Sequence, residues 1–216
     1  MRPLSHTSPA TDTQGICCIT IAASGFLPVG SIVLHCLGFL SLPACLTALV
    51  IPGVLLTIVL AVQFPALGKT VLFGWIAGII AVAVYDLSRV PYILNGWSDF
   101  IPRIGAWANN STHPDAFIGY LWRYMGNGGG MGIAFFVLMK HFRPYGKMIQ
   151  NGVLFGMFIF SCLMFVLIIS EQAQEMMFKI TPLSFTGSLT GHIVYGLVLG
   201  YLGKRYFAKQ HATFNG

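Results

Sequence analysis

Long apolar stretches alternate with short polar connections along most of the chain. A helix needs about 20 predominantly apolar residues to cross a bilayer, and six stretches reach that length. The predicted spans are residues 16–38, 44–64, 70–90, 116–139, 150–170 and 182–203. The pattern therefore predicts an all-α polytopic bundle in which residues 1–216 form one transmembrane domain.

Prolines interrupt the first two predicted spans, at Pro28 and Pro52. Proline is tolerated in such helices because neighbouring helices can satisfy the freed carbonyls. Residues 1–14 are polar with one basic residue, Arg2, which makes a poor start for a signal peptide. We expect the first span to be retained, with cleavage near Ala22-Ala23-Ser24 as the alternative.

The connection between the third and fourth spans is long and aromatic. Pro91 is expected to end the preceding helix, since proline disfavours helical backbone in the residue before it. Apolar residues then recur at helical spacing, at Trp97, Ile101, Ile104 and Trp107. We expect an amphipathic helix over residues 97–108 in the outer interface, with Asp99 as N-cap and Pro102 in its first turn. An irregular aromatic loop fits the same residues.

Glycines four residues apart recur on four of the predicted spans. Such stripes let helix backbones approach closely in a membrane. They are Gly74 and Gly78, Gly128 and Gly132, Gly152 and Gly156, Gly187 and Gly191, and Gly196 and Gly200. We expect them to form helix–helix contacts.

The composition agrees with a membrane protein. Hydrophobic residues make up 56% and charged residues 8% of the chain, against roughly 25% charged residues in soluble domains. Most of the net charge of +6 comes from Lys69 and from segments 140–147 and 204–209, which fall on one side of a six-span topology. The positive-inside rule then predicts that both termini lie in the cytoplasm, and the expected location is a bacterial inner membrane. Because membrane topology accounts for the basic residues, we expect no nucleic-acid partner. The expected outer interfacial anchors are Trp97, Trp107 and Trp122.

No motif in the chain specifies catalysis, so we expect no catalytic, cofactor-binding or metal site. The five cysteines form no Cys-x-x-Cys pair and are interpreted as packing residues. The run from Gly126 to Gly130 lacks the Gly-Lys-Ser/Thr of a phosphate loop, which argues against nucleotide binding. A bis-histidine haem would need His35 and His192, and a hydrogen-bonded packing role is the favoured interpretation of His192.

Polar residues nevertheless occur inside the predicted spans. Arg123 and Asp86 lie at similar depth, and a charge in lipid needs a partner, so we expect them to pair, with Arg89 capping the pair. Asn127 and His192 lie deeper, where we expect a shared hydrogen bond. This candidate polar cluster is either a structural clamp between helices, which we favour, or a substrate or ion site.

Two motifs within these spans carry a resemblance. Tyr85-Asp86-x-x-Arg89 ends the third span, and Asn127-Gly128-x-x-x-Gly132 lies in the fourth. From the third span to the sixth, the chain resembles uncharacterised bacterial polytopic inner-membrane proteins that carry a Tyr-Asp-x-x-Arg helix end and a His-x-x-Asn-Gly helix. Tyr124 stands here where that pattern has its histidine. The resemblance implies a polytopic fold and no assigned activity.

Two functional hypotheses follow. Sparse polar chemistry, together with more glycine stripes than a small bundle needs, favours a non-catalytic integral subunit of a larger membrane protein complex. Its partners would be membrane lipids and other integral membrane subunits. The alternative is a small transporter or channel that uses the polar cluster.

Overall fold

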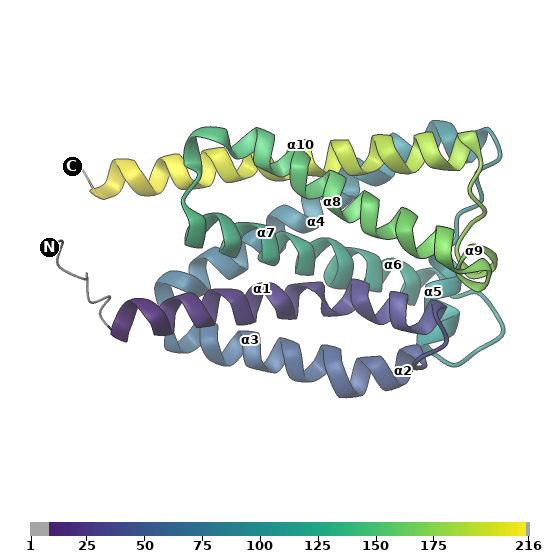
Figure 1. Cartoon of the computed structure of the whole chain (residues 1–216), viewed down its shortest axis with the longest axis horizontal. Helices are drawn as coiled ribbons and strands as arrows, with labels where there is room; N and C mark the ends of the chain where they lie inside the picture. The colour runs from purple at the N-terminus through teal and green to yellow at the C-terminus, as the bar shows by residue number, and fades with distance from the viewer. Residues whose placement is uncertain (1–8, 215–216) are drawn as a thin grey trace, which may run out of the picture.

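The computed structural model describes the backbone of residues 9–214 and the side chains of residues 13–210. Every regular element in this part of the chain is helical, and the elements join into six long antiparallel rods (Figure 1). In chain order they are α1 (Pro9–Cys36), α2 (Leu42–Cys45), the π-helical η1 (Leu46–Val50), α3 (Ile51–Gln63), α4 (Pro65–Leu94), α5 (Ile101–Ala108), α6 (Ala116–Leu121), the π-helical η2 (Trp122–Gly128), α7 (Gly129–Phe142), the 3-10 turn η3 (Tyr145–Lys147), α8 (Met148–Ile169), α9 (Glu171–Met176) and α10 (Pro182–Phe214).

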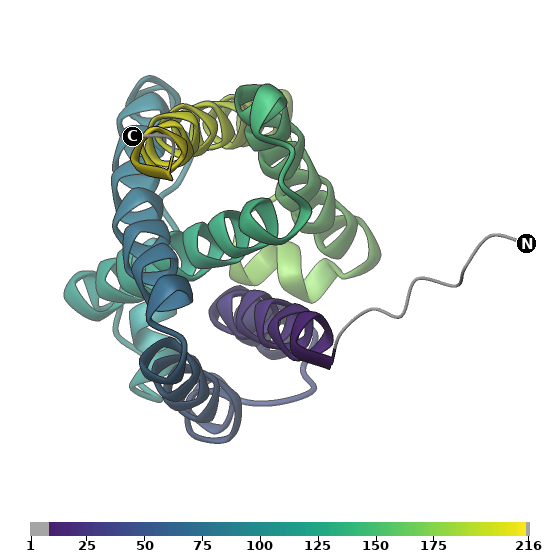
Figure 2. The same ribbon diagram turned by 90° about the vertical axis from the view of Figure 1, so that its left-hand side faces the viewer.

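Within the described residues, five helical stretches are long and apolar enough to cross a membrane, which indicates a membrane protein. They are Thr13–Cys36, Leu42–Gln63, Pro65–Leu94, Tyr145–Ile169 and Pro182–Gln210. The remaining rod, α6–η2–α7, covers residues 116–142 and is interrupted by its π-helical segment. Seen along the rods, α7 runs through the middle of the bundle between α1 and α4 (Figure 2).

The glycine stripes bring neighbouring rods into backbone contact, as their spacing predicts. On α4, a Cβ atom at Gly78 would overlap the carbonyl oxygen of Gly128 on η2. On α8, a Cβ atom at Gly152 would meet the backbone of Gly196 on α10 in the same way. Gly187 and Gly191 on α10 differ, because they accommodate aromatic rings and not another backbone. Most of these glycines are therefore used within this chain, so they are not in excess of what the bundle needs.

The prediction that Pro91 ends its helix is wrong. Helix α4 continues through Pro91 for one more turn, to Leu94. The turn is retained because Asn95 donates from its backbone N–H (3.2 Å) and its side chain (2.7 Å) to the Pro91 carbonyl. The hydroxyl of Tyr92, in the same turn, lies 3.0 Å from that of Thr190 on α10. Tertiary contacts thus outweigh the local cost of the proline.

The short helix α5 lies inside the range predicted for an interfacial helix but is four residues shorter at its start. Pro102 is in its first turn, as expected. Asp99 lies just before the helix, and its carboxylate accepts a hydrogen bond from the Ile101 N–H (3.2 Å). Its buried face, which includes Ile104, packs on α6. At Gly105 the two helices meet through their backbones.

The cysteines behave as packing residues with one exception. Cys17, Cys18, Cys36 and Cys45 are buried free thiols, whereas Cys162 is exposed on α8. The four buried thiols fill space between α1, α2 and their neighbours, in agreement with the interpretation from sequence.

Candidate functional site: a buried polar cluster

Asp86 on α4 and Arg123 on η2 form the ion pair that the sequence predicts. The Arg123 Nε atom donates to both carboxylate oxygens of Asp86, at 2.8 and 2.9 Å, and its Nη2 atom donates to Oδ1. Arg123 is 9% exposed. A fork of this kind fixes both the distance and the angle between the two helices, because the guanidinium and the carboxylate are planar.

A second ion pair, between Arg89 and Asp99, extends this network toward α5. Arg89 donates to Asp86 (3.2 Å) and to Asp99 (3.3 Å), so it links the two carboxylates. The other oxygen of Asp99 accepts a 2.7 Å hydrogen bond from the Tyr120 hydroxyl. Asp99 and Tyr120 were not expected in the cluster. With them it holds two acidic and two basic side chains, and its net charge is zero.

Aromatic rings cover both arginines. The Arg123 guanidinium lies 4.7 Å from the ring centre of Tyr85, and that of Arg89 lies 4.7 Å from Trp97 and 5.8 Å from Phe100. Such contacts stabilise a cation most when water is excluded. Here they also separate the charges from the surrounding apolar side chains.

The burial of Trp97 corrects one expectation. Its side chain is 4% exposed and packs edge-on against Phe178, so it is not available to anchor the protein at a membrane interface. The other two expected anchors are half-buried. Trp122 donates from Nε1 to the Pro28 carbonyl (3.3 Å), and the ring of Trp107 lies 5.1 Å from that of His35.

The hydrogen bond expected between Asn127 and His192 does not form. His192 Nδ1 lies 2.7 Å from the Ser188 carbonyl oxygen, so it carries the proton and donates to that carbonyl. The imidazole packs edge-on against Tyr85, whose hydroxyl is 3.5 Å from Nδ1. The Oδ1 atom of Asn127 is buried without a hydrogen-bond partner. His192 is thus joined to the cluster through Tyr85, whereas Asn127 is not.

The π-helical segment η2 carries both Arg123 and Asn127. Other helices bind its carbonyl groups: Trp75 on α4 donates to Met125 (3.2 Å), and the Tyr195 hydroxyl on α10 donates to Gly128 (3.0 Å). Wider helical turns of this kind often occur at functional sites. In this chain the widened turns are held by side chains from two neighbouring rods.

A large apolar groove lies beside the cluster but is lined by other residues. Its volume is about 850 Å³, and its walls come from α1, η1–α3, α4 and α6–η2–α7. Several of its lining residues are small: Ser24, Gly25, Ala61, Gly68, Gly126 and Gly130. On α3, the lining residues Val54, Ile58 and Val62 are each at least 50% exposed. The groove is therefore open along the side where α3 lies.

The fold and the cluster define an all-helical membrane protein whose rods are joined by a neutral, buried network of ion pairs. The chain belongs to a family of unknown function, DUF6789, which matches residues 68–214. The matched region contains the whole polar cluster, whereas α1 and α3 precede it. No curated protein and no solved structure matches the chain.

Proposed function

We propose that this chain is a non-catalytic integral subunit of a larger membrane protein complex. The observation that supports this role is the open apolar groove beside α3. The stretch that contains α3 is the least buried of the five apolar ones. A groove of this size between helices is filled either by lipid or by another protein segment.

A transmembrane helix of a partner subunit is the occupant we propose. The groove extends along the rods from Ala108, at the end of α5, to Gly68, near the start of α4. Ala61 and Ala108 are small lining residues at which another helix backbone can approach closely, which lipid chains do not require. The glycine stripes no longer support assembly, because they are occupied within the chain.

In this proposal the polar cluster is a structural clamp. Each carboxylate of the cluster accepts hydrogen bonds from two or more side chains, and its charges cancel. A site that binds and releases a charged substrate needs at least one group able to exchange its partner. The compact network therefore favours a role in fixing α4, α5 and α6–η2–α7 relative to one another.

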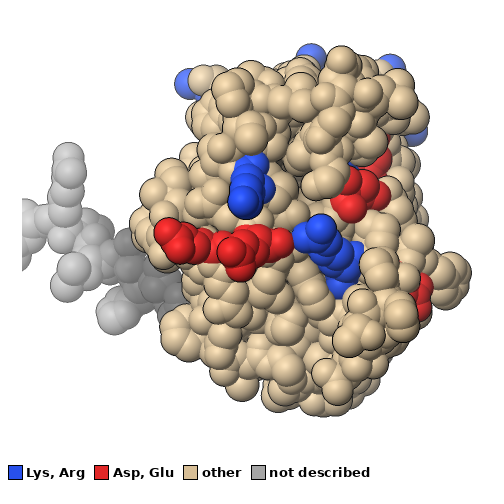
Figure 3. Space-filling model, turned by 90° about the vertical axis from the view of Figure 1, so that its right-hand side faces the viewer, with Lys and Arg blue, Asp and Glu red and all other residues tan. Residues whose placement is uncertain are grey.

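The topology we propose has six spans, with α6–η2–α7 as the fourth, and places both termini in the cytoplasm of a bacterial inner membrane. Helix α1 begins and helix α10 ends at the same end of the bundle (Figure 1). That end carries Lys69, Arg143 and Lys204 among its exposed basic residues. The opposite end mixes acidic and basic side chains (Figure 3). Helix α5 would lie near the outer interface at that end.

Filling the groove tests the proposed role. Ile58→Trp places a large side chain in the groove. Val59→Trp is the control, because it introduces the same tryptophan at a neighbouring residue of similar exposure that does not line the groove. After purification in mild detergent, a partner subunit should be lost from the first variant and retained by the second. Equal retention by both variants would contradict the groove as the binding site.

A small transporter or channel is the second candidate. The observation that favours it is the buried, unpartnered Oδ1 atom of Asn127 on the π-helical segment, one turn from Arg123. Asn127→Leu separates the two roles, since it removes this acceptor without disturbing an ion pair. A variant that remains folded and assembled but loses solute or ion flux in proteoliposomes would support transport over the subunit role.

A further inference from the structure

The polar side chains that line the large groove are hydrogen-bonded within the chain, with one exception. The lining includes five of them: Ser24, Thr57, Trp75, Asn109 and Trp122. All but Thr57 donate to a carbonyl or carboxylate oxygen of the chain, at 3.0 to 3.3 Å. Among the described residues, no group forms a hydrogen bond with the side chain of Thr57 on α3. Its hydroxyl is therefore the one polar group of the groove that still needs a partner.

The hydroxyl of Thr57 lies at a depth where little water is available. Thr57 is 8% exposed, and it precedes the end of the Leu42–Gln63 stretch by about 9 Å along the helix. The stretch has 22 residues and spans about 33 Å, against roughly 30 Å for the hydrocarbon core of a bilayer. The hydroxyl is thus inside the apolar layer, where an unpaired polar group is costly.

Thr47, earlier in the same rod, shows the usual arrangement. Its hydroxyl donates to the Pro43 carbonyl, four residues earlier in the chain, at 3.1 Å. Serine and threonine in helices often satisfy their hydroxyl group in this way. Thr57 makes no equivalent bond to Gly53 within the described structure, so its hydroxyl remains available to another molecule.

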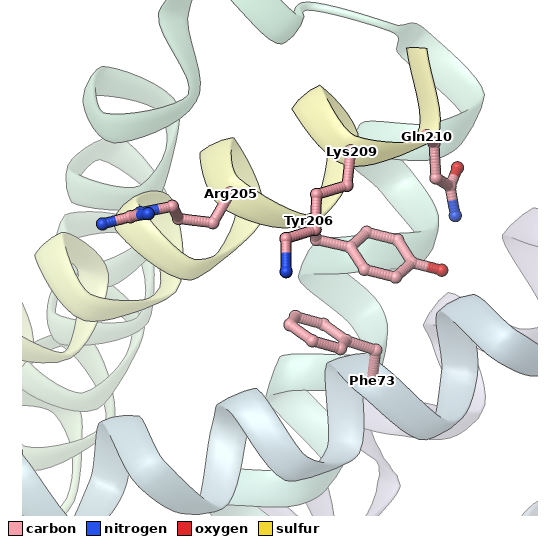
Figure 4. Close-up of a pocket in the computed structure, with 5 residues that line it drawn as sticks. All are labelled: Phe73, Arg205, Tyr206, Lys209 and Gln210. Carbon is pink, nitrogen blue, oxygen red and sulfur yellow. The ribbon is translucent and has the colours of Figure 1, made fainter. Parts of the chain in front are cut away.

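A smaller pocket between α4 and α10 has polar groups that are held within the chain. It is lined by Phe73, Arg205, Tyr206, Lys209 and Gln210 (Figure 4). The Tyr206 hydroxyl lies 3.1 Å from Thr70 Oγ1, and Arg205 Nη2 donates to the Tyr201 hydroxyl at 2.7 Å. These two groups fix the pocket wall, whereas Thr57 presents an unused hydroxyl to the groove.

The groove face of α3 allows another helix to come close to this hydroxyl. Val54, Thr57, Ile58, Ala61 and Val62 line the groove and recur at the spacing of one helix face. Thr57 and Ala61 are four residues apart, and small residues at this spacing allow helix backbones to approach closely in a membrane. A side chain on a helix that runs along α3 can therefore reach the Thr57 hydroxyl.

We propose that Thr57 selects the partner helix, which presents a serine, threonine, asparagine or glutamine side chain to its hydroxyl. This inference rests on the proposed subunit role, since it specifies which kind of helix the groove accepts. Acyl chains carry no hydrogen-bonding group at this depth, so a lipid in the groove would leave the hydroxyl unpaired. An entirely apolar helix would do the same, and one polar contact thus discriminates between candidate helices.

The isolated chain provides the first test. Thr57→Val removes the hydroxyl but keeps a β-branched side chain, and no hydrogen bond within the described chain is lost. Thermal unfolding of the purified chain in detergent should therefore be unchanged or shifted to higher temperature. A shift to lower temperature would show that the hydroxyl is used within the chain and would overturn the inference.

Retention of the partner provides the second test. The integral membrane protein that co-purifies with the unaltered chain is identified by peptide mass spectrometry, and native mass spectrometry measures its ratio to each variant. Thr57→Val should reduce retention about three- to tenfold, whereas Thr57→Ser, which keeps the hydroxyl, should stay within about twofold of the unaltered chain. Thr47→Val is the matched control, because it removes a hydroxyl from the same rod outside the groove and should leave retention unchanged.

The outcomes separate this inference from the groove itself. Full retention by Thr57→Val together with loss from Ile58→Trp would refute the polar contact and leave the groove as the binding site. Full retention by both variants, or a chain that co-purifies with no other protein, would contradict both proposals. Replacing the partner's hydrogen-bonding residue by alanine should weaken the complex of the unaltered chain but add no further loss to Thr57→Val. Additive losses would refute a direct contact.

Discussion

The ion-pair network predicts that Asp86 is harder to replace than Arg123, although the two side chains bind each other. Asp86 accepts from two arginines, so Asp86→Asn leaves both guanidinium groups with only Asp99 to balance them. After Arg123→Gln, Asp86 still has Arg89 at 3.2 Å. The two single variants therefore differ in how much uncompensated charge they leave buried.

The magnitudes follow from this difference. Removing one partner of a buried ion pair typically costs about 3–5 kcal/mol, and we expect at least about 3 kcal/mol for Asp86→Asn. For Arg123→Gln we expect about 1.5–3 kcal/mol, the range for losing hydrogen bonds to a charged group. The neutral double variant should lose less stability than the sum of the two single losses, and the difference, which is the coupling energy, should be about 1–2 kcal/mol. A charge swap is a poorer test, because Asp86→Arg would place two arginines three residues apart.

Reversible unfolding in mixed detergent micelles, followed by tryptophan fluorescence, measures all four members of this cycle. Glu171→Gln is the control, since it neutralises an exposed carboxylate at the end of the bundle and should change stability by less than about 0.5 kcal/mol. Strictly additive single effects would show that Asp86 and Arg123 do not interact. A larger loss for Arg123→Gln than for Asp86→Asn would contradict the role given to Arg89.

Packing, hydrogen bonding and topology each give a further prediction. Gly78→Ala should lower the free energy of unfolding by about 1–3 kcal/mol, because the new Cβ atom overlaps a facing backbone carbonyl. Gly30→Ala has no atom within 4 Å of its new Cβ and should raise the free energy of unfolding by about 0.5–1 kcal/mol. Thermal unfolding in detergent compares the two variants. Tyr195→Phe removes a buried hydrogen bond but keeps the ring, and should cost about 1 kcal/mol in the same assay. A reporter fused after Lys209 should report from the cytoplasm, and one within residues 109–115 from the opposite side.

Helical periodicity and charge were enough to predict the all-helical class of membrane protein and one contact of the site. The rise per residue places Asp86 and Arg123 at similar depth, and the cost of an unpaired charge in lipid leaves pairing as the cheapest solution. Both deductions need only positions along a helix. The spacing of Gly74 and Gly78 likewise predicts that another helix backbone can approach this face of α4, although it does not indicate that Gly128 lies opposite.

Contacts that depend on how helices are rotated, or on how a connection folds, could not be predicted in this way. His192 faces Tyr85 and Ser188 and not Asn127, which sequence spacing does not reveal. Asp99 was expected to cap a surface helix, but the connection folds back so that its carboxylate also binds Arg89. The same fold also buries Trp97, although tryptophan is a residue type that is typical of membrane interfaces.

The most direct test of the subunit proposal is the composition of the unaltered protein as it leaves the membrane. The chain is extracted from its native membrane in a mild detergent, purified, and weighed intact by native mass spectrometry. The proposal predicts a complex that contains at least one other integral membrane protein at a fixed ratio. A chain that is recovered alone, as a monomer or as copies of itself, in every mild detergent would contradict it.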